Sequence, residues 1–270
     1  MTERSRGNSL ARNPRPNLLP ARSRGEKSAE SDADEYQLVL VDHTPGQERV
    51  IEILQGRSKA GFIAWLKEQK ENGSLSQLTE VTCDLWEPYR QAVREVLEIE
   101  PTADRFHVQQ QLNDRINQTR REIQRKLPEA QKDALKGLRW ILVKPSEDLS
   151  PSENERLRPA LESFPEIRRL VDSRDQLRAI FDDPTIDSPE KGKSALEAWA
   201  TKVRTFGSTA LNKFCDTLTR WIDPISRYFL SRANNGRTEG YNRGIRMLVS
   251  RAFGLPCFKH LRLRILGVYG

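Results

Sequence analysis

The first part of the chain with a clear pattern holds two short apolar segments separated by polar turn formers. Residues 36–42 read as a strand, residues 43–47 supply turn formers, and residues 49–54 form a second apolar segment. The pattern therefore predicts a β-hairpin. Residues 59–69 change to helical spacing, and their apolar side chains are Phe62, Ile63, Trp65 and Leu66.

Two more short apolar segments predict strands, and each is followed by a helix. Residues 78–84 form the first of these strands and end in an acid, Asp84. Pro88 then occupies the favoured first position of a helix that extends to Leu97. Residues 102–106 predict a fourth strand, which leads into a helix over residues 107–126.

The later part of the chain is predicted to be helical. Residues 129–232 carry helical patterns separated by prolines, and only residues 140–143 resemble a strand. We therefore expect an α/β core interrupted by an all-α insertion. The predicted organisation is a disordered basic arm (1–34), the first part of the core (35–128), the helical insertion (129–232) and a basic helical C-terminal part of the core (233–270).

Composition narrows the class of protein. No segment approaches the roughly 20 apolar residues that a membrane span needs, and the N-terminus lacks the apolar region of a secretory signal. The three cysteines, Cys83, Cys215 and Cys257, lie far apart and are odd in number. They fit neither a disulfide framework nor a zinc cluster, which favours a cytoplasmic location.

Positive charge is concentrated near the C-terminus. Residues 232–264 hold eight basic residues against one acid, Glu239, so their local excess of seven equals the whole chain's net charge of +7. A polyanionic partner, with nucleic acid as the first candidate, is one interpretation, and a solvated helix face is the other. The eight are Arg232, Arg237, Arg243, Arg246, Arg251, Lys259, Arg262 and Arg264.

Two acids lie at predicted junctions between a strand and a helix. Asp84 ends a strand, and ligand and metal sites collect at that edge of α/β sheets; a turn or helix-capping aspartate is the alternative. Asp104 precedes His107 by three residues, so its carboxylate could fix the imidazole tautomer. The alternative is a capping aspartate with an unrelated surface histidine.

A third candidate, Glu239, lies where a new helix is expected to begin near Gly236 or Arg237. The first turn of a helix favours the ionised form of a glutamate. Arg243 and Arg246 follow at helical spacing, so a salt-bridged structural glutamate is the alternative.

Together, Asp84 and Glu239 suggest metal-dependent phosphodiester chemistry. Two carboxylates beside a sheet can hold Mg²⁺, which prefers oxygen ligands. Two such ions can activate the attacking oxygen and stabilise the leaving one. Nearby arginines would hold the DNA backbone; the candidates are Arg237, Arg243, Arg246 and Arg251.

Several motifs resemble those of one family. Residues 235–242 (NGRTEGYN), with Ile245, residues 251–254, Phe258 and residues 261–265, resemble the C-terminal signature of the ISL-three insertion-sequence transposases. Residues 83–89 resemble the segment around that family's second catalytic aspartate. Residues 104–108 resemble its D-x-x-H motif. The motifs occur in the family's order from Tyr36 to the C-terminus.

The resemblance implies an RNase H-like fold with a helical insertion, and DDE-type metal-dependent DNA strand cleavage and transfer at insertion-sequence ends. Carried over by position, Asp84 and Glu239 are the second and third catalytic acids and ligate Mg²⁺ or Mn²⁺. Asp104 and His107 are their supporting pair. The implied partners are terminal-repeat DNA, target DNA and a second copy of the chain, at the nucleoid of the cytoplasm.

The first catalytic acid of the family has no obvious equivalent. Its position falls near Glu26, in a segment without an apolar run able to form a strand. Asp34 and Asp42 are other substitutes, although Asp42 is expected to face a turn. The family's zinc-binding and helix-turn-helix regions also lack a counterpart. We therefore expect an N-terminally truncated or degenerate copy with little activity, and a non-catalytic DNA-binding remnant or a helical scaffold protein are the alternatives.

Overall fold

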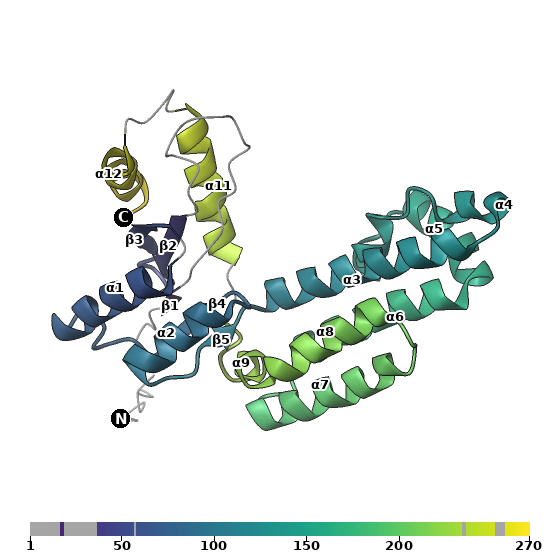
Figure 1. Cartoon of the computed structure of the whole chain (residues 1–270), viewed down its shortest axis with the longest axis horizontal. Coiled ribbons are helices and arrows are strands. Elements are labelled where there is room, and N and C mark those ends of the chain that lie inside the picture. The colour runs from purple at the N-terminus through teal and green to yellow at the C-terminus, as the bar shows by residue number, and fades with distance from the viewer. Residues whose placement is uncertain (1–16, 19–36, 57, 234–235, 252–256) are drawn as a thin grey trace, which may run out of the picture. The chain divides into compact units, whose positions relative to one another are not determined.

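The computed structural model describes residues 17–18, 37–56, 58–233, 236–251 and 257–270. The chain divides into two compact units (Figure 1). Unit 1 comprises Met1–Val81 and Arg237–Gly270, and unit 2 comprises Thr82–Gly236. The elements are mostly helices with two small sheets, so the predicted α/β class is confirmed.

The predicted hairpin is the centre of unit 1. Strands β2 (Gln37–Asp42) and β3 (Arg49–Gln55) pair antiparallel, and Ile51 has no partner because the register shifts beside Val41. The backbone N–H of Gln47 donates to the carbonyl of Thr44 at 2.9 Å and closes the turn. The extra residue is a β-bulge, which twists the hairpin locally.

The apolar face of this hairpin packs against two helices from the end of the chain, α11 (Gly236–Arg251) and α12 (Phe258–Tyr269). Helix α1 (Lys59–Glu71) begins at Ser58, whose hydroxyl accepts a hydrogen bond from Gly61, and buries Phe62 and Leu66. The helices predicted to begin near residues 59 and 236 are therefore confirmed. The residues shared by the hairpin core are Val39, Val41, Val50, Ile53, Ile245, Leu261 and Ile265.

The boundary between the units falls within β4 (Glu80–Cys83). Its first half pairs in parallel with β1 (Asn17–Leu18), and its second half pairs in parallel with β5 (Thr102–Ala103). Both predicted strands are confirmed but are shorter than expected. Helix α2 (Glu87–Leu97) follows β4, and α3 (Arg105–Lys126) follows β5, starting two residues earlier than predicted because Asp104 caps it.

Unit 2 is otherwise helical. Pro151, Pro165 and Pro189 each open a helix at a position where the missing N–H costs nothing. No helix in the described part of the chain has the length and apolar character to cross a membrane. The remaining helices are α4 (Glu129–Lys132), α5 (Pro151–Ser163), α6 (Pro165–Asp182), α7 (Pro189–Arg204), α8 (Thr209–Arg220), α9 (Ile222–Ser226) and α10 (Tyr228–Ser231), with the short 3-10 turns η2 (Asp133–Leu135), η3 (Ile141–Val143) and η4 (Ser146–Asp148).

The strand expected at residues 140–143 is wrong. Ile141–Val143 forms the 3-10 turn η3, because its neighbours close helical turns: Leu142 N–H donates to Leu138 at 2.9 Å and Lys144 N–H to Trp140 at 3.2 Å. Ile141 and Leu142 are buried in the helical core rather than in a sheet. Apolar runs this short do not distinguish a strand from a buried turn.

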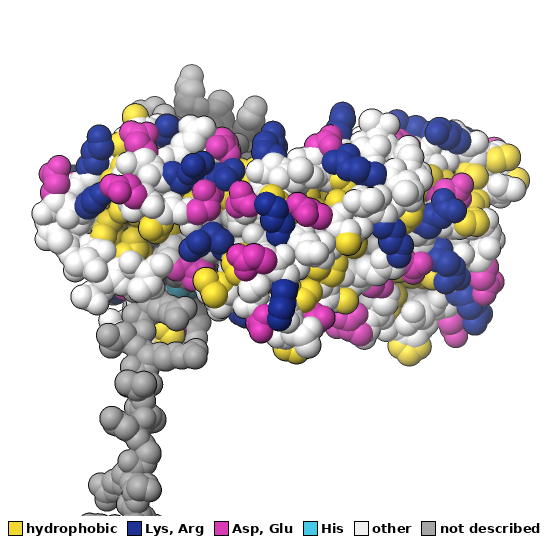
Figure 2. Space-filling model, turned by 90° about the horizontal axis from the view of Figure 1, so that it is seen from below, with side chains coloured by type: hydrophobic (Ala, Val, Ile, Leu, Met, Phe, Trp, Pro, Cys, Tyr) yellow, Lys and Arg dark blue, Asp and Glu magenta, His cyan; other side chains and the backbone are white. Residues whose placement is uncertain are grey.

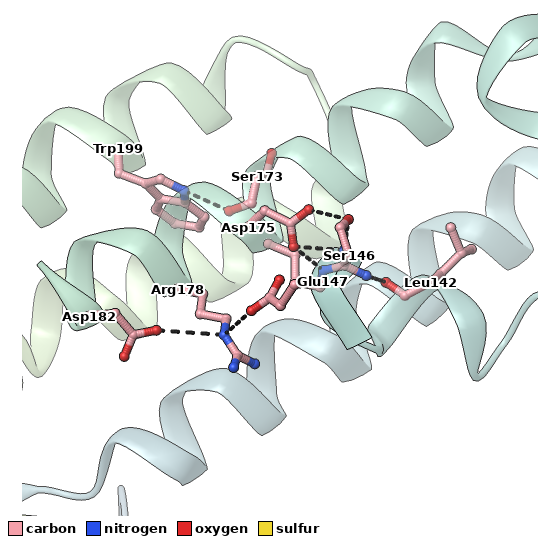
Figure 3. Close-up of polar contacts among 9 residues, drawn as sticks. Leu142, Ser146, Glu147, Ser173, Asp175, Arg178, Asp182 and Trp199 are labelled. Atoms are coloured by element: carbon pink, nitrogen blue, oxygen red, sulfur yellow. Dashed lines mark hydrogen bonds and ion pairs between the residues drawn. The ribbon is translucent and has the colours of Figure 1, made fainter. Parts of the chain in front are cut away.

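A buried arginine, Arg174, holds this irregular segment on α6. Figure 3 shows the surrounding residues, among them Leu142, Ser146 and Asp175. Arg174 is 6% exposed and donates hydrogen bonds to the carbonyl of Leu142 at 2.7 Å and the hydroxyl of Ser146 at 2.8 Å. Its charge is balanced by Asp175, 2.7 Å away. Arg174 therefore supplies a hydrogen-bond donor to a buried backbone carbonyl in the irregular segment between α3 and α5.

We expect Arg174→Met to destabilise unit 2 by about 3–5 kcal/mol, because it leaves a buried carbonyl and a carboxylate without their cation. Arg178→Gln is the matched control. Arg178 is one turn further along α6 and forms more exposed ion pairs with Glu147 and Asp182, worth less than about 1 kcal/mol. Urea denaturation followed by circular dichroism measures both, and equal losses would contradict the structure.

Candidate functional site

Asp84 lies at the carboxyl end of β4, as the sequence predicts. Its residue is 8% exposed, and its carbonyl accepts the N–H of Trp86 at 2.7 Å in the turn that leads into α2. The N–H of Asp104 donates to the carbonyl of Cys83 at 3.0 Å. Since β4 and β5 run parallel, this bond brings the ends of both strands, and both acids, to one sheet edge.

His107 joins these acids from the first turn of α3. Its Nε2 atom lies 2.6 Å from Oδ1 of Asp84 but 3.8 Å from Oδ2 of Asp104. The spacing suggested a hydrogen bond to Asp104, yet Asp84 is the closer partner. The Asp104 carboxylate instead accepts the N–H of Phe106 at 3.1 Å and caps α3.

The electrostatics of this triad favour a charged imidazole. Burial alone would lower the pKa of His107, but the hydrogen bond to Asp84 and the charges of Asp84 and Asp104 outweigh it, so the pKa is raised. On its other side, Nδ1 lies 3.3 Å from the side-chain oxygen of Gln110. His107 therefore fixes the orientation of the Asp84 carboxylate in the described structure.

Cys83 lies directly behind this edge and is fully buried. Burial, and next the negative charge of Asp84, raise the pKa of its thiol far above the ordinary value. Cys215 is also buried, whereas Cys257 is exposed. Because the thiolate is the reactive form, the raised pKa and the burial of Cys83 both slow its reaction with thiol reagents.

We expect a thiol reagent to modify Cys257 in the native chain and to reach Cys83 only after unfolding. Mass spectrometry of alkylated peptides, with and without denaturant, measures this. Cys215, a buried thiol on α8, is the internal control. Rapid alkylation of Cys83 in the folded chain would show that the end of β4 is not packed as described.

Glu239 lies in the first turn of α11, as predicted, and is exposed. Among the described residues it forms no ion pair with Arg243 or Arg246, so the interpretation as a salt-bridged structural glutamate gains no support. Arg243, Arg246 and Arg251 are exposed on the same helix. The side chain of Arg237 lies outside the described residues.

Two interactions that the sequence does not reveal hold this first turn in place. Nε2 of His43, in the loop after β2, lies 2.7 Å from the hydroxyl of Thr238, which is 3% exposed. The hydroxyl of Tyr241 donates to the carbonyl of Glu48 at 2.8 Å. His43 and Thr238 are 195 residues apart, so only the folded chain brings them together. They fix the backbone that carries Glu239.

We expect Thr238→Val to destabilise unit 1 by about 1–2 kcal/mol, because it removes a buried hydrogen bond while keeping the side-chain shape. Ser250→Ala, at an exposed position on the same helix, is the control and should change the stability by less than about 0.5 kcal/mol. Thermal unfolding measures both variants. A Thr238→Val chain as stable as the control would contradict a structural role for the His43 contact.

The other proposed acids divide between described and undescribed parts of the chain. Asp42 accepts the N–H of Thr44 at 2.9 Å, which is the turn role expected for it. Glu26 and Asp34 lie outside the described residues. Asp84 belongs to unit 2 and Glu239 to unit 1.

Two of the eight C-terminal basic residues are used within the fold. Arg262 forms a two-pronged ion pair with Glu52 on β3. Arg232 donates to the carbonyls of Phe181, Asp183 and Ile186 at 2.5–2.7 Å. On the face shown in Figure 2, Lys and Arg side chains are interspersed with Asp and Glu rather than gathered. The charge count alone therefore overstates the cations free to meet a polyanion.

Asp84 and Glu239 suit a divalent metal in ligand type, since Mg²⁺ prefers carboxylate oxygens. Asp84 uses Oδ1 for His107, which leaves Oδ2 to offer. Across the described ranges, no group of three or more His, Cys, Asp or Glu side chains is arranged to hold a metal ion. Each acid is therefore, by itself, one ligand rather than a complete site.

Comparison with known proteins gives a consistent result. Residues 26–265 match the model of the ISL3 (ISL-three) family of DDE transposases, described as a transposase. The chain is also 24% identical over 240 residues to the transposase for insertion sequence element IS1001 of Bordetella parapertussis. The alignment covers 85% of this chain and 56% of that relative. No solved structure matches significantly.

Proposed function

Because the chain belongs to the ISL3 family of DDE transposases, we propose that it carries part of a catalytic domain that cleaves and joins DNA strands at insertion-sequence ends. The observation that best supports this is the sheet edge where Asp84, Asp104 and His107 meet. A carboxylate held in one orientation at the end of a strand is what metal-dependent phosphodiester chemistry requires.

In this proposal Asp84 and Glu239 are the second and third catalytic acids and ligands of Mg²⁺ or Mn²⁺. The bound metal would activate the attacking oxygen and stabilise the leaving oxygen of the phosphodiester. His107 orients Asp84 through its 2.6 Å contact. Asp104 caps α3 and so fixes the turn from which His107 reaches the carboxylate.

The exposed arginines of α11 are proposed to bind the DNA backbone beside Glu239. Arg243, Arg246 and Arg251 project from the helix whose first turn carries that acid, and Arg237 belongs to the same segment. Arginine suits this role because its planar guanidinium matches phosphate oxygens. We further propose that the substrate is DNA and that the partner is a second copy of the chain. The chain itself spans 56% of the length of the IS1001 transposase that it resembles.

The proposed architecture is an RNase H-like core interrupted by the helical insertion of residues 129–232, with residues 35–128 and 233–270 on either side. Two observations support it. The β2–β3 hairpin and helix α11, which carries Glu239, are far apart in the sequence, yet α11 packs on the hairpin. The mostly helical unit 2 lies between them in the chain.

A non-catalytic DNA-binding protein is the second candidate. It is favoured by the sequence of residues 22–30, which has no apolar run for a strand that would carry a first catalytic acid. In that case the exposed arginines would retain DNA affinity without strand cleavage.

We expect Glu239→Gln and Asp84→Asn each to lower metal-dependent cleavage of DNA carrying the element's ends by roughly a thousandfold. Both variants should bind that DNA at least as tightly as the unaltered chain, because each removes a negative charge. Glu68→Gln, an exposed acid on α1, is the control and should cleave normally.

Gel analysis of labelled strands with Mg²⁺ or Mn²⁺ measures cleavage, and a shift assay measures binding. Cleavage that survives both substitutions would overturn the catalytic assignment. A chain that binds DNA but never cleaves it would establish the second candidate instead.

A further inference from the structure

Two arginines near the end of α3, Arg120 and Arg121, and a third, Arg139, are near enough for the charges of Arg121 and Arg139 to act on Arg120. We call Arg120, Arg121 and Arg139 the arginine cluster. Arg120 is 8% exposed, and its Nη1 donates to Gln124 at 3.0 Å and to the carbonyl of Leu135 at 3.3 Å. Its Nε atom is buried, and no residue that the structure describes offers it a hydrogen-bond partner. Within the described residues, none of the three forms an ion pair.

Burying Arg120 without a carboxylate costs desolvation energy that an ion pair would normally offset. Burial, followed by the positive charges of Arg121 and Arg139, lowers the pKa of Arg120. A buried cation is normally paired, because its desolvation is expensive. The acids nearest in sequence are engaged elsewhere: Glu122 accepts the side-chain amide of Gln118, and Asp133 lies beside Lys136. Neither Glu122 nor Asp133 therefore forms an ion pair with the three arginines.

Specific contacts fix the backbone on both sides of Arg139 and Trp140. Gly137 has a φ of 74°, which favours glycine, and an added Cβ would lie 2.1 Å from Nη2 of Arg156. That Arg156 atom donates to the carbonyl of Lys136 at 3.3 Å. After Trp140, Arg174 holds the carbonyl of Leu142. Both sides of Arg139 and Trp140 are thus fixed by buried or closely packed groups.

An aromatic ring adjoins the cluster. Trp140 is 70% exposed, and the guanidinium carbon of Arg139 lies 4.6 Å from its ring centroid. The cation–π contact holds the two side chains together, and both are exposed. Exposed tryptophan beside unpaired arginine matches nucleic acid, which offers phosphates to the cations and a flat base or sugar to the ring.

We propose that the arginine cluster and Trp140 form a second DNA-binding surface, on the helical unit and separate from the arginines of α11. The exposed cations Arg121 and Arg139 bind backbone phosphates, and the indole packs against a sugar or base. The choice of DNA among polyanions rests on the proposed function. The surface itself rests on the unpaired charge and the exposed ring.

The test is fluorescence anisotropy of a labelled duplex with the full chain over a range of KCl concentrations. We expect Arg121→Gln/Arg139→Gln to weaken binding by about tenfold and to lower the salt slope by about 2, since each lost phosphate contact removes roughly 0.9. Trp140→Ala should weaken binding several-fold without changing the slope, because it removes no charge. Arg120 stays unaltered because it is buried.

The matched control is Arg168→Gln/Lys213→Gln, which removes two exposed cations from α6 and α8. Equal affinities and slopes for the cluster and control variants would overturn the inference. If binding is lost on changing Arg243 and Arg246 but not the cluster, the inference fails and the proposed function stands. A chain that binds no DNA at all overturns both.

Discussion

The hydrogen bond from the N–H of Asp104 to the carbonyl of Cys83 is the link on which the candidate site depends. It aligns the end of β4 with the start of α3, so that a turn aspartate, a capping aspartate and a helix histidine converge. The strands are too short to hold this geometry by themselves. The helices that follow the two strands, α2 and α3, each bury apolar residues of their own, and these anchor the segments that carry the polar groups.

Local patterns in the sequence predicted much of this fold. Two apolar segments joined by turn formers within residues 36–54 predicted the hairpin, and the Asn and Gly residues before Arg237 located the start of α11. Contacts between distant residues were not predictable. Nothing local to His43 indicates Thr238, and the Asp104–His107 spacing gives no sign that Asp84 is the nearer partner. Residues 140–143 were assigned wrongly because the burial of Ile141 and Leu142 in a helical core, rather than propensity, decides their conformation.

Charge shows the same difference between sequence and structure. The C-terminal basic run is conspicuous in the sequence. In the structure, however, Arg232 donates its hydrogen bonds to backbone carbonyls and Arg262 donates to Glu52. Arg120 is unremarkable in the sequence, one arginine among many in a polar helix. In the folded chain it is a buried cation beside two others. The available partners of each guanidinium, rather than a count of residues, determine where an anion is attracted.

The division of the chain also sets an order of events during synthesis. Unit 2 is a single continuous segment, so all of its core leaves the ribosome together. The hairpin is made before unit 2, but the helices that cover its apolar face are made after it; Arg262 meets Glu52 across 210 residues. A nascent chain must therefore carry Val39, Val50 and Ile53 uncovered while the helical segment is translated. During that interval the exposed apolar surface can be bound by chaperones or can aggregate with other chains.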